Sequence, residues 1–508
     1  MLRGDAVAHD QTRQSERRCS TGVEGLDDIL GGGLQCEHTF LLEGHPGTGK
    51  TTIALDFLLA GAREGERGLY ITLSETEAEL RASAAAHGWT LPEEITVFEL
   101  VPPESLLDAD QQQSLLYSSD LELGETTRMI FDAIDRVKPD RIVLDSLSEI
   151  RLLAESSLRY RRQVLALKHD FAKRGVTVLM LDDMTSTTKD KTVHSVVHGV
   201  IGLEELAPDY GGERRRLRIH KMRGQTYRGG YHDFSIKTGG VAVFPRLVAA
   251  EHKTSFERGT LTTGITELDA LTGGGIQQGS SALILGPSGA GKSVFVLQFV
   301  AAAAARGERV AMFVFDEELE LLLNRSDDLG FDLRRYAEEG TALIEQVDAA
   351  ESSPGEFAHR VARAVIETGA KTVVIDSLNG YMAAMPEERA LLLHVHELLQ
   401  YLNRQGATTF LTLAQRGMVD DMRSPIDLTY LADTAILLRF FEAMGHVRRA
   451  VSIMKKRTGA HEDTIREFKI GGGGLTLGEP LEHFQGVLRG TPQYHGQDGP
   501  LLRQDEPE

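Results

Sequence analysis

The sequence contains only two cysteines and one tryptophan, and its 55 Lys and Arg are outnumbered by 75 Asp and Glu, giving a net charge of −20. Cys19 and Cys36 are too few for a disulfide framework and lack metal-ligand spacing, so a reducing cytosol is the natural setting. The acidic excess gives no general attraction to nucleic acid or anionic lipid. No apolar run approaches about 18 residues, and residues 1–20 are too polar for a signal peptide. We therefore expect a soluble cytoplasmic protein that binds no membrane and for which nucleic acid is an improbable partner.

One motif is present twice. Residues 44–52 read G-H-P-G-T-G-K-T-T and residues 286–293 read G-P-S-G-A-G-K-S, which both fit G-x-x-x-x-G-K-[ST]. In this loop backbone N–H groups surround a polyphosphate, the lysine reaches its β- and γ-phosphates, and the hydroxyl binds Mg²⁺. An apolar strand precedes each loop and helical apolar spacing follows it, so a helix N-terminus faces the phosphates. We expect two sites for ATP and Mg²⁺, one formed by Gly44, Gly47, Thr48, Gly49, Lys50, Thr51 and Thr52 and the other by Gly286, Ser288, Gly289, Ala290, Gly291, Lys292 and Ser293.

The two loops lie in a duplicated domain. The openings T-G-V-E-G-L-D at Thr21 and T-G-I-T-E-L-D at Thr263 are about 242 positions apart, and Lys50 and Lys292 repeat that interval. Strands and helices alternate downstream of each loop, which predicts a mostly parallel sheet covered by helices on both faces. We expect a disordered segment over residues 1–18, one α/β domain over 19–250, a second over 251–488, and a flexible tail over 489–508.

Acidic residues follow matched strands of the two halves. Residues 68–73 and 310–315 are apolar strands, followed by Glu75 in the first half and by Asp316 and Glu317 in the second. These carboxylates are candidate catalytic groups that orient water on the γ-phosphate, although helix N-terminal acids would look the same. The next matched strands, 141–144 and 372–375, are each followed directly by an aspartate. The predicted Mg²⁺ ligands are Thr51 with Asp145, and Ser293 with Asp376.

Basic residues close each half. Lys221 and Arg223 end a strand of the first half, and Lys455 and Arg457 end its counterpart in the second. They lie far in sequence from their own phosphate loops, so they are candidates for completing the site of a neighbouring subunit, as an arginine finger does. A solvated surface would also carry such charges, and the sequence leaves both interpretations open.

These features together resemble the KaiC family of circadian clock ATPases and kinases, in the RecA-like superfamily. The resemblance covers roughly residues 19–495 and is most specific at the K-M-R-G of residues 221–224, at the I-R-E-F of residues 465–468, and at the L-R-G-T-P of residues 488–492. It implies two tandem RecA-like P-loop ATPase domains and a double-ring homohexamer with ATP held between subunits. It also implies ATP hydrolysis in the first half, serine/threonine autokinase and autophosphatase activity in the second, and regulatory protein partners.

The resemblance also identifies departures from the family pattern. The family's paired catalytic glutamates fall on Ser74 and Glu75, and on Asp316 and Glu317, so hydrolysis in the first half would depend on Glu75 alone. The family's phosphorylated Ser-Thr pair falls on Thr429 and Tyr430. Thr429 is then the candidate phosphosite, with Ser424 close by, and the alternative is a threonine that only hydrogen-bonds locally.

Two other functions fit the same motifs. A DNA-handling RecA-type ATPase would have the same loops and strands, but the net charge of −20 argues against it. A signalling scaffold would use nucleotide only to control assembly and partner docking, without kinase activity.

Overall fold

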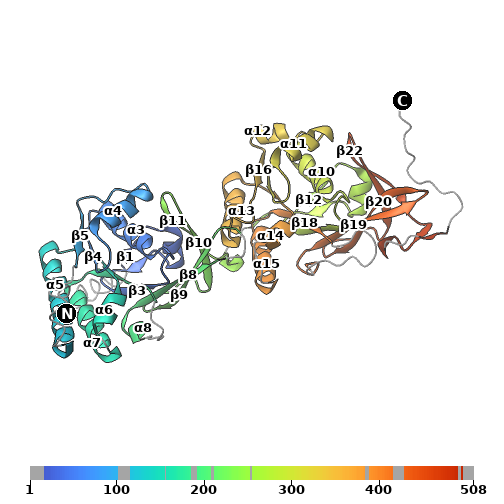
Figure 1. The fold of residues 1–508 in the computed structure, drawn as a ribbon. Helices are drawn as coiled ribbons and strands as arrows, with labels where there is room; N and C mark the ends of the chain where they lie inside the picture. The colour runs from blue at the N-terminus through green and yellow to red at the C-terminus, as the bar shows by residue number, and fades with distance from the viewer. Residues whose placement is uncertain are drawn as a thin grey trace, which may run out of the picture. The chain divides into compact units, whose positions relative to one another are not determined.

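The computed structural model describes residues 17–100, 115–154, 156–184, 192–207, 211–251, 255–383, 388–415, 428–489 and 493–495. The chain divides into two compact units, Met1–Arg246 and Leu247–Glu508, close to the boundary expected near residue 250. In each unit a twisted sheet is packed against helices (Figure 1). Ser424 and most of the predicted terminal segments lie outside the described residues.

The first unit is built on a nine-stranded sheet of order β11-β10-β9-β8-β3-β7-β6-β4-β5. The six strands from β8 to β5 are parallel, and β9 to β11 extend the sheet antiparallel. Because helices cover both faces of the parallel part, the strands β3, β4, β6 and β7 are buried along their whole length. The strands are β3 (Thr39–Glu43), β4 (Gly68–Thr72), β5 (Ile95–Glu99), β6 (Arg141–Asp145), β7 (Thr177–Asp182), β8 (Gly199–Leu206), β9 (Arg214–Met222), β10 (Tyr231–Lys237) and β11 (Gly240–Phe244). The helices are α2 (Glu24–Ile29), α3 (Lys50–Arg63), α4 (Glu77–Ala86), α5 (Leu115–Val137), α6 (Leu147–Ala154), α7 (Ser157–Arg174) and α8 (Thr192–Val196).

The second unit repeats this architecture. Its nine-stranded sheet has the order β16-β15-β17-β18-β14-β19-β20-β21-β22, again with a parallel part and an antiparallel extension. The strands are β14 (Ser281–Gly286), β15 (Val310–Val314), β16 (Ala342–Gln346), β17 (Thr372–Asp376), β18 (Thr408–Ala414), β19 (Thr434–Ala443), β20 (His446–Lys456), β21 (Ile465–Gly471) and β22 (Gly474–Pro480). The helices are α9 (Thr266–Leu271), α10 (Lys292–Ala305), α11 (Leu319–Asp328), α12 (Leu333–Glu338), α13 (Pro354–Thr368), α14 (Leu378–Ala383) and α15 (Glu388–Arg404). The predicted fold class, two tandem α/β domains with mostly parallel sheets, is confirmed.

The strand order places each phosphate loop at the centre of its sheet. The first loop follows β3, which lies between β7 and β8, and the second follows β14, between β18 and β19. The carboxyl ends of the parallel strands β4, β6 and β7 reach the same edge as the first loop. In open α/β sheets this is the edge where ligands bind.

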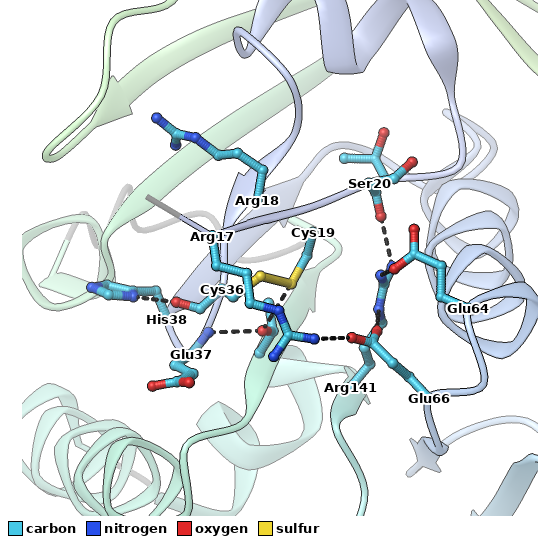
Figure 2. The surroundings of a disulfide bond; sticks show 12 residues. Arg17, Arg18, Cys19, Ser20, Cys36, Glu37, His38, Glu64, Glu66 and Arg141 are labelled. Atoms are coloured by element: carbon cyan, nitrogen blue, oxygen red, sulfur yellow. Dashed lines mark hydrogen bonds and ion pairs between the residues drawn. A yellow bond between two sulfur atoms is a disulfide. The ribbon is translucent and has the colours of Figure 1, made fainter. Parts of the chain in front are cut away.

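The two cysteines form a disulfide (Figure 2). Strand β1 (Arg18–Cys19) pairs antiparallel with β2 (Leu34–Gln35), which brings Cys19 beside Cys36 although 17 positions separate them. The sequence argument from two cysteines to a reducing setting did not anticipate this pair, because a count of spacings carries no information on strand pairing. Near the disulfide, Arg17 binds Glu66 at 2.8 Å.

The C-terminal segment also forms a short sheet. β24 (Gln493–Tyr494), within the predicted flexible tail, pairs with β23 (Phe484–Gln485). Among the helices that the structure describes, none combines the length and apolar character needed to cross a bilayer.

Candidate active sites

Each phosphate loop leads directly into a helix whose first N–H groups are open. Gly49 and Gly291 precede α3 and α10 with φ of 93° and 97°, and neither helix has a side-chain cap. A Cβ added to Gly49 would lie 2.5 Å from Ile236 Cδ1, and one added to Gly291 would lie 2.8 Å from Ile470 Cδ1. The backbone conformation therefore favours glycine here, and a side chain would also displace the end of an isoleucine. The helix N-terminus stays available to an anion.

The loop lysines fold back over their own loops. Lys50 Nζ donates to the carbonyl oxygens of Gly44 at 2.8 Å and His45 at 3.0 Å. Lys292 Nζ donates in the same way to Gly286 at 3.1 Å and to Pro287 at 2.8 Å. Both ammonium groups lie inside the loop, where they can meet the phosphates of a nucleotide.

The predicted Mg²⁺ ligands of the first site are brought together by a residue that the sequence analysis missed. The Tyr70 hydroxyl donates to Asp145 Oδ2 at 2.5 Å and also hydrogen-bonds with Thr51. Burial raises the pKa of Asp145 to about 6, and the charges of Glu75 and Asp183 act in the same direction. Burial also raises the pKa of Glu75, which suits a group that accepts a proton. No side-chain pattern around Tyr70 in the sequence marks this role.

In the second unit the predicted residues line a cavity of about 680 Å³. Asp316, Glu317 and Asp376 line it from the ends of β15 and β17, at the same edge of the sheet as the loop. Burial lowers the pKa of Lys292, and the charges of Asp376 and Asp316 oppose this shift. The predicted loop residues in the lining are Ser288, Gly289, Gly291, Lys292 and Ser293. Gly286, which ends β14, and the buried Ala290 are outside it.

The second site holds its acidic side chains in specific contacts. Glu317 forms a bidentate ion pair with Arg325, with N–O distances of 2.6 and 2.7 Å. Ser377 donates to Asp316, and Thr412 donates to Asp376. Arg325 and Ser377 were not predicted; Ser377 could have been found from the D-S pair that recurs at Asp145 and Asp376.

The donor sets of both sites fit Mg²⁺ bound together with a nucleotide. Across the described residues, no group of three or more His, Cys, Asp or Glu side chains could hold a metal ion by itself. Mg²⁺ usually takes one or two protein oxygens, waters and substrate phosphates rather than an all-protein cage. A hydroxyl next to the loop lysine and a strand-ending aspartate supply that pair of oxygens.

The basic strand ends, Lys221 with Arg223 and Lys455 with Arg457, lie at the edge of the sheet opposite the phosphate loops. The Arg223 N–H donates to the His198 carbonyl, and the His198 N–H donates to that of Thr39, the first residue of β3. Thr39 is five residues before Gly44, so about 16 Å of strand separates Arg223 from its own loop. In the second unit the Arg457 N–H donates to the Asp433 carbonyl, and the Asp433 N–H donates to that of Ser281, the first residue of β14.

In both units these basic residues hold one segment by its carbonyl oxygens. Lys455 Nζ donates to Thr429 at 2.9 Å, and Arg457 donates to Tyr430 at 2.6 Å. In the first unit Lys221 donates to His194 and Arg223 to Ser195. The candidate phosphosite Thr429 therefore lies beside the basic strand end and corresponds to His194 in the first unit.

One acidic residue at the first site was not predicted. Asp183, directly after β7, has its Oδ1 3.0 Å from Lys50 Nζ. The sequence does contain a signal for it, because residues 182–183 are Asp-Asp at the end of a buried strand, as in the two strands whose acids were singled out. The corresponding strand of the second half ends in Leu413 and Ala414.

Comparison with known proteins agrees with this geometry. The family model of the KaiC ATPase matches residues 19–248 and 261–482, one match for each unit. The chain is 27% identical over 500 residues to the circadian clock protein KaiC3 of Synechocystis sp., covering 96% of this chain and 97% of the relative. It is 27% identical over 495 residues to the circadian clock oscillator protein KaiC of Parasynechococcus marenigrum, covering 96% and 95% of the two chains. It is 28% identical over 490 residues to KaiC of Parathermosynechococcus lividus, covering 93% and 87%. The chain therefore belongs to the KaiC family of ATPases.

Proposed function

We propose that this protein hydrolyses ATP at both sites, assembles into a homohexameric ring with nucleotide between subunits, and phosphorylates itself at Thr429 as part of a clock-like regulatory system. The observation that carries the proposal is the shared arrangement of the two sites. In each, a loop lysine, buried in the first unit and half-buried in the second, lies near a strand-ending aspartate and a glutamate at the carboxyl edge of a parallel sheet. The clock-like role rests on the names of the relatives, which are circadian clock proteins.

The residues of the first site have separate roles in this proposal. Lys50 and the open N-terminus of α3 bind the phosphates, while Tyr70 holds Thr51 and Asp145 together. Bound Mg²⁺ would neutralise charge on the β- and γ-phosphates. Glu75, whose pKa is raised by burial, accepts a proton from the attacking water.

The position of the basic residues supports sites shared between subunits. Arg223 and Arg457 lie at the opposite edge of the sheet from their own loops, which supports contact with the loop of another copy rather than with their own. Thr429 is held by Lys455, next to Arg457. If that strand end enters a neighbour's site, Thr429 comes close to the neighbour's γ-phosphate, which supports phosphorylation between subunits.

The test is incubation of the purified protein with γ-labelled ATP, measuring both free phosphate and label on the protein. Lys50→Ala and Lys292→Ala each remove one site, and Thr429→Ala is the matched control for the acceptor. We expect phosphate release from both single-lysine variants, and label that is lost in Lys292→Ala and Thr429→Ala but kept in Lys50→Ala. Phosphate release without label in any variant would reduce the proposal to a two-site ATPase without kinase activity, whereas no release at all would reject it.

A further inference from the structure

The two sites differ in where their carboxylates come from. In the second site Asp316 and Glu317 follow β15, whereas the first site has Ser74 and Glu75 after β4 and so lacks one carboxylate there. The strand beside the loop strand shows the opposite difference: an acid follows it in the first unit and none follows it in the second. Strand register pairs Glu43 with Asp182 in the first unit and Leu285 with Leu413 in the second, so Asp183 corresponds to Ala414.

Asp183 lies within the phosphate site. Its Oδ1 is 3.0 Å from Lys50 Nζ, and its Oδ2 accepts a hydrogen bond from Ser146 Oγ at 3.1 Å. Its backbone N–H donates to Ser148 Oγ at 3.1 Å, which fixes the start of the segment after β7. The side chain is 31% exposed and therefore faces open space beside the buried lysine.

The contact with Ser146 has a counterpart in the second site. Ser146 follows Asp145 at the end of β6, and Ser377 follows Asp376 at the end of β17. Ser377 donates to Asp316. The same serine position thus holds a carboxylate in both sites, which comes from β15 in the second unit and from the end of β7 in the first.

The charges lead to the same correspondence. Asp183 is an acid beside the loop lysine, with its Oδ1 3.0 Å from Lys50 Nζ. In the second site Asp316 and Lys292, which matches Lys50, line the same cavity. Asp183 therefore occupies the electrostatic position of Asp316 although it comes from a different strand.

We propose that Asp183 is the second catalytic carboxylate of the first site and compensates for the serine at position 74. The inference rests on the proposed hydrolysis of ATP at that site. The water oxygen forms a bond to the γ-phosphorus, the bond from that phosphorus to the bridging oxygen breaks, and ADP leaves. One water proton passes to Glu75, while Asp183 accepts a hydrogen bond from the other and so orients the attack.

The test uses the full chain with Lys292→Ala, in which only the first site can turn over. Adding Asp183→Asn should lower kcat by about 10- to 100-fold with KM changed less than about threefold, because a transition-state contact is lost and ground-state binding is not. Asp132→Asn, at an exposed position of α5, is the matched control and should leave both constants unchanged. The decisive variant moves the carboxylate: Ser74→Asp added to Asp183→Ala should recover most of the lost kcat.

The reciprocal experiment moves a carboxylate in the second site, from position 316 to position 414, and leaves Asp183 unchanged. In the Lys50→Ala chain, Asp316→Ser should lower turnover at the second site, and Ala414→Asp added to it should restore turnover. Faster or unchanged hydrolysis with tighter ATP binding in Asp183→Asn would overturn the proposal, because Asp183 would then only restrain Lys50. If the Lys292→Ala parent binds a fluorescent ATP analogue but releases no phosphate, hydrolysis at the first site fails and this inference fails with it.

Discussion

At the scale of single residues, Asp56 shows how a buried position selects a charge state. It lies on α3 with 4% of its surface exposed, and burial raises the pKa of its carboxyl from 3.8 to about 7 against the opposing effects of the Val241 N–H and Arg63. The matched residue of the second unit is Gln298, whose neutral amide donates to Thr263 and accepts from Leu475. A neutral group therefore suits this position in both units.

We expect Asp56→Asn to remove a pH-dependent loss of stability. Since the folded state binds the Asp56 proton more tightly than the unfolded chain, the free energy of unfolding falls as pH rises from about 4 to 7. The variant should be more stable than the wild type by about 1–2 kcal/mol at pH 8 and by much less at pH 5. Urea unfolding followed by Trp89, the only tryptophan, reports on this unit. Asp132→Asn is the control, and equal pH slopes in wild type and Asp56→Asn would contradict the prediction.

The disulfide gives a second prediction at this scale. Cys19 and Cys36 close a loop of 17 positions, and a loop of that length removes about 3 kcal/mol of unfolded-state entropy. Reduction with dithiothreitol should therefore lower the urea midpoint of the Trp89 signal, and the Cys19→Ser, Cys36→Ser protein should match the reduced wild type and not respond to reductant. Turnover at the second site, measured in the Lys50→Ala chain, should stay the same. Identical midpoints with and without reductant would show that the cross-link contributes no stability.

At the scale of elements, helix α4 fixes the segment that carries Glu75. Thr76 caps the helix with a capping box, in which its hydroxyl accepts from the Glu79 N–H and the Glu79 carboxylate accepts from the Thr76 N–H. The counterpart α11 begins after Glu318 and has no side-chain cap. The segment between β4 and α4 is thus held at both ends, because Thr72 also accepts from the Glu75 N–H at 2.9 Å.

Thr76→Ala should loosen this segment and lower activity at the first site. Loss of such a cap costs about 1 kcal/mol of stability. The catalytic step should also slow, because Glu75 directly precedes the cap residue and would share the motion of the frayed turn. The measurement is kcat of Thr76→Ala in the Lys292→Ala chain, beside urea unfolding. Ser156→Ala removes the cap of α7 and is the control, with a similar stability loss and unchanged kcat. Equal effects of both variants on kcat would mean that the cap does not position Glu75.

The elements also show what could be predicted from sequence. The central strands were predicted because β3, β4, β6 and β7 are continuous buried apolar runs, and the acids at their ends follow from local order alone. The arginine run of residues 214–216 opens β9, where Arg216 binds Glu204 across the strand pair. Asp183 follows a buried strand, as the predicted acids do, but its contact with Lys50 joins segments far apart in sequence, and so does the disulfide. No local pattern encodes which strands become neighbours.

At the scale of the whole molecule, the placement of the basic residues bears on the proposal that two chains make one site. Lys50 and Arg223 lie at opposite edges of the same sheet, and Lys292 and Arg457 repeat this arrangement in the second unit. A single chain thus presents each loop at one edge of the sheet and each basic strand end at the other. Such a chain suits a closed ring with head-to-tail contacts, in which every interface joins a loop to a basic strand end.

Mixed rings test this directly. In the Lys292→Ala background, a chain with Lys50→Ala keeps Arg223 but has no working loop, and a chain with Arg223→Ala keeps the loop but offers no arginine. Each chain alone should be almost inactive. Co-expressed in equal amounts with different tags, they should recover about one quarter of the wild-type turnover per site, because a quarter of the interfaces then join an intact loop to an intact arginine. Purification through both tags, with native mass spectrometry, verifies the mixing. If the mixed rings form and stay inactive, Arg223 acts within its own chain or not at all. Substantial activity of the Arg223→Ala chain alone would exclude it from the site.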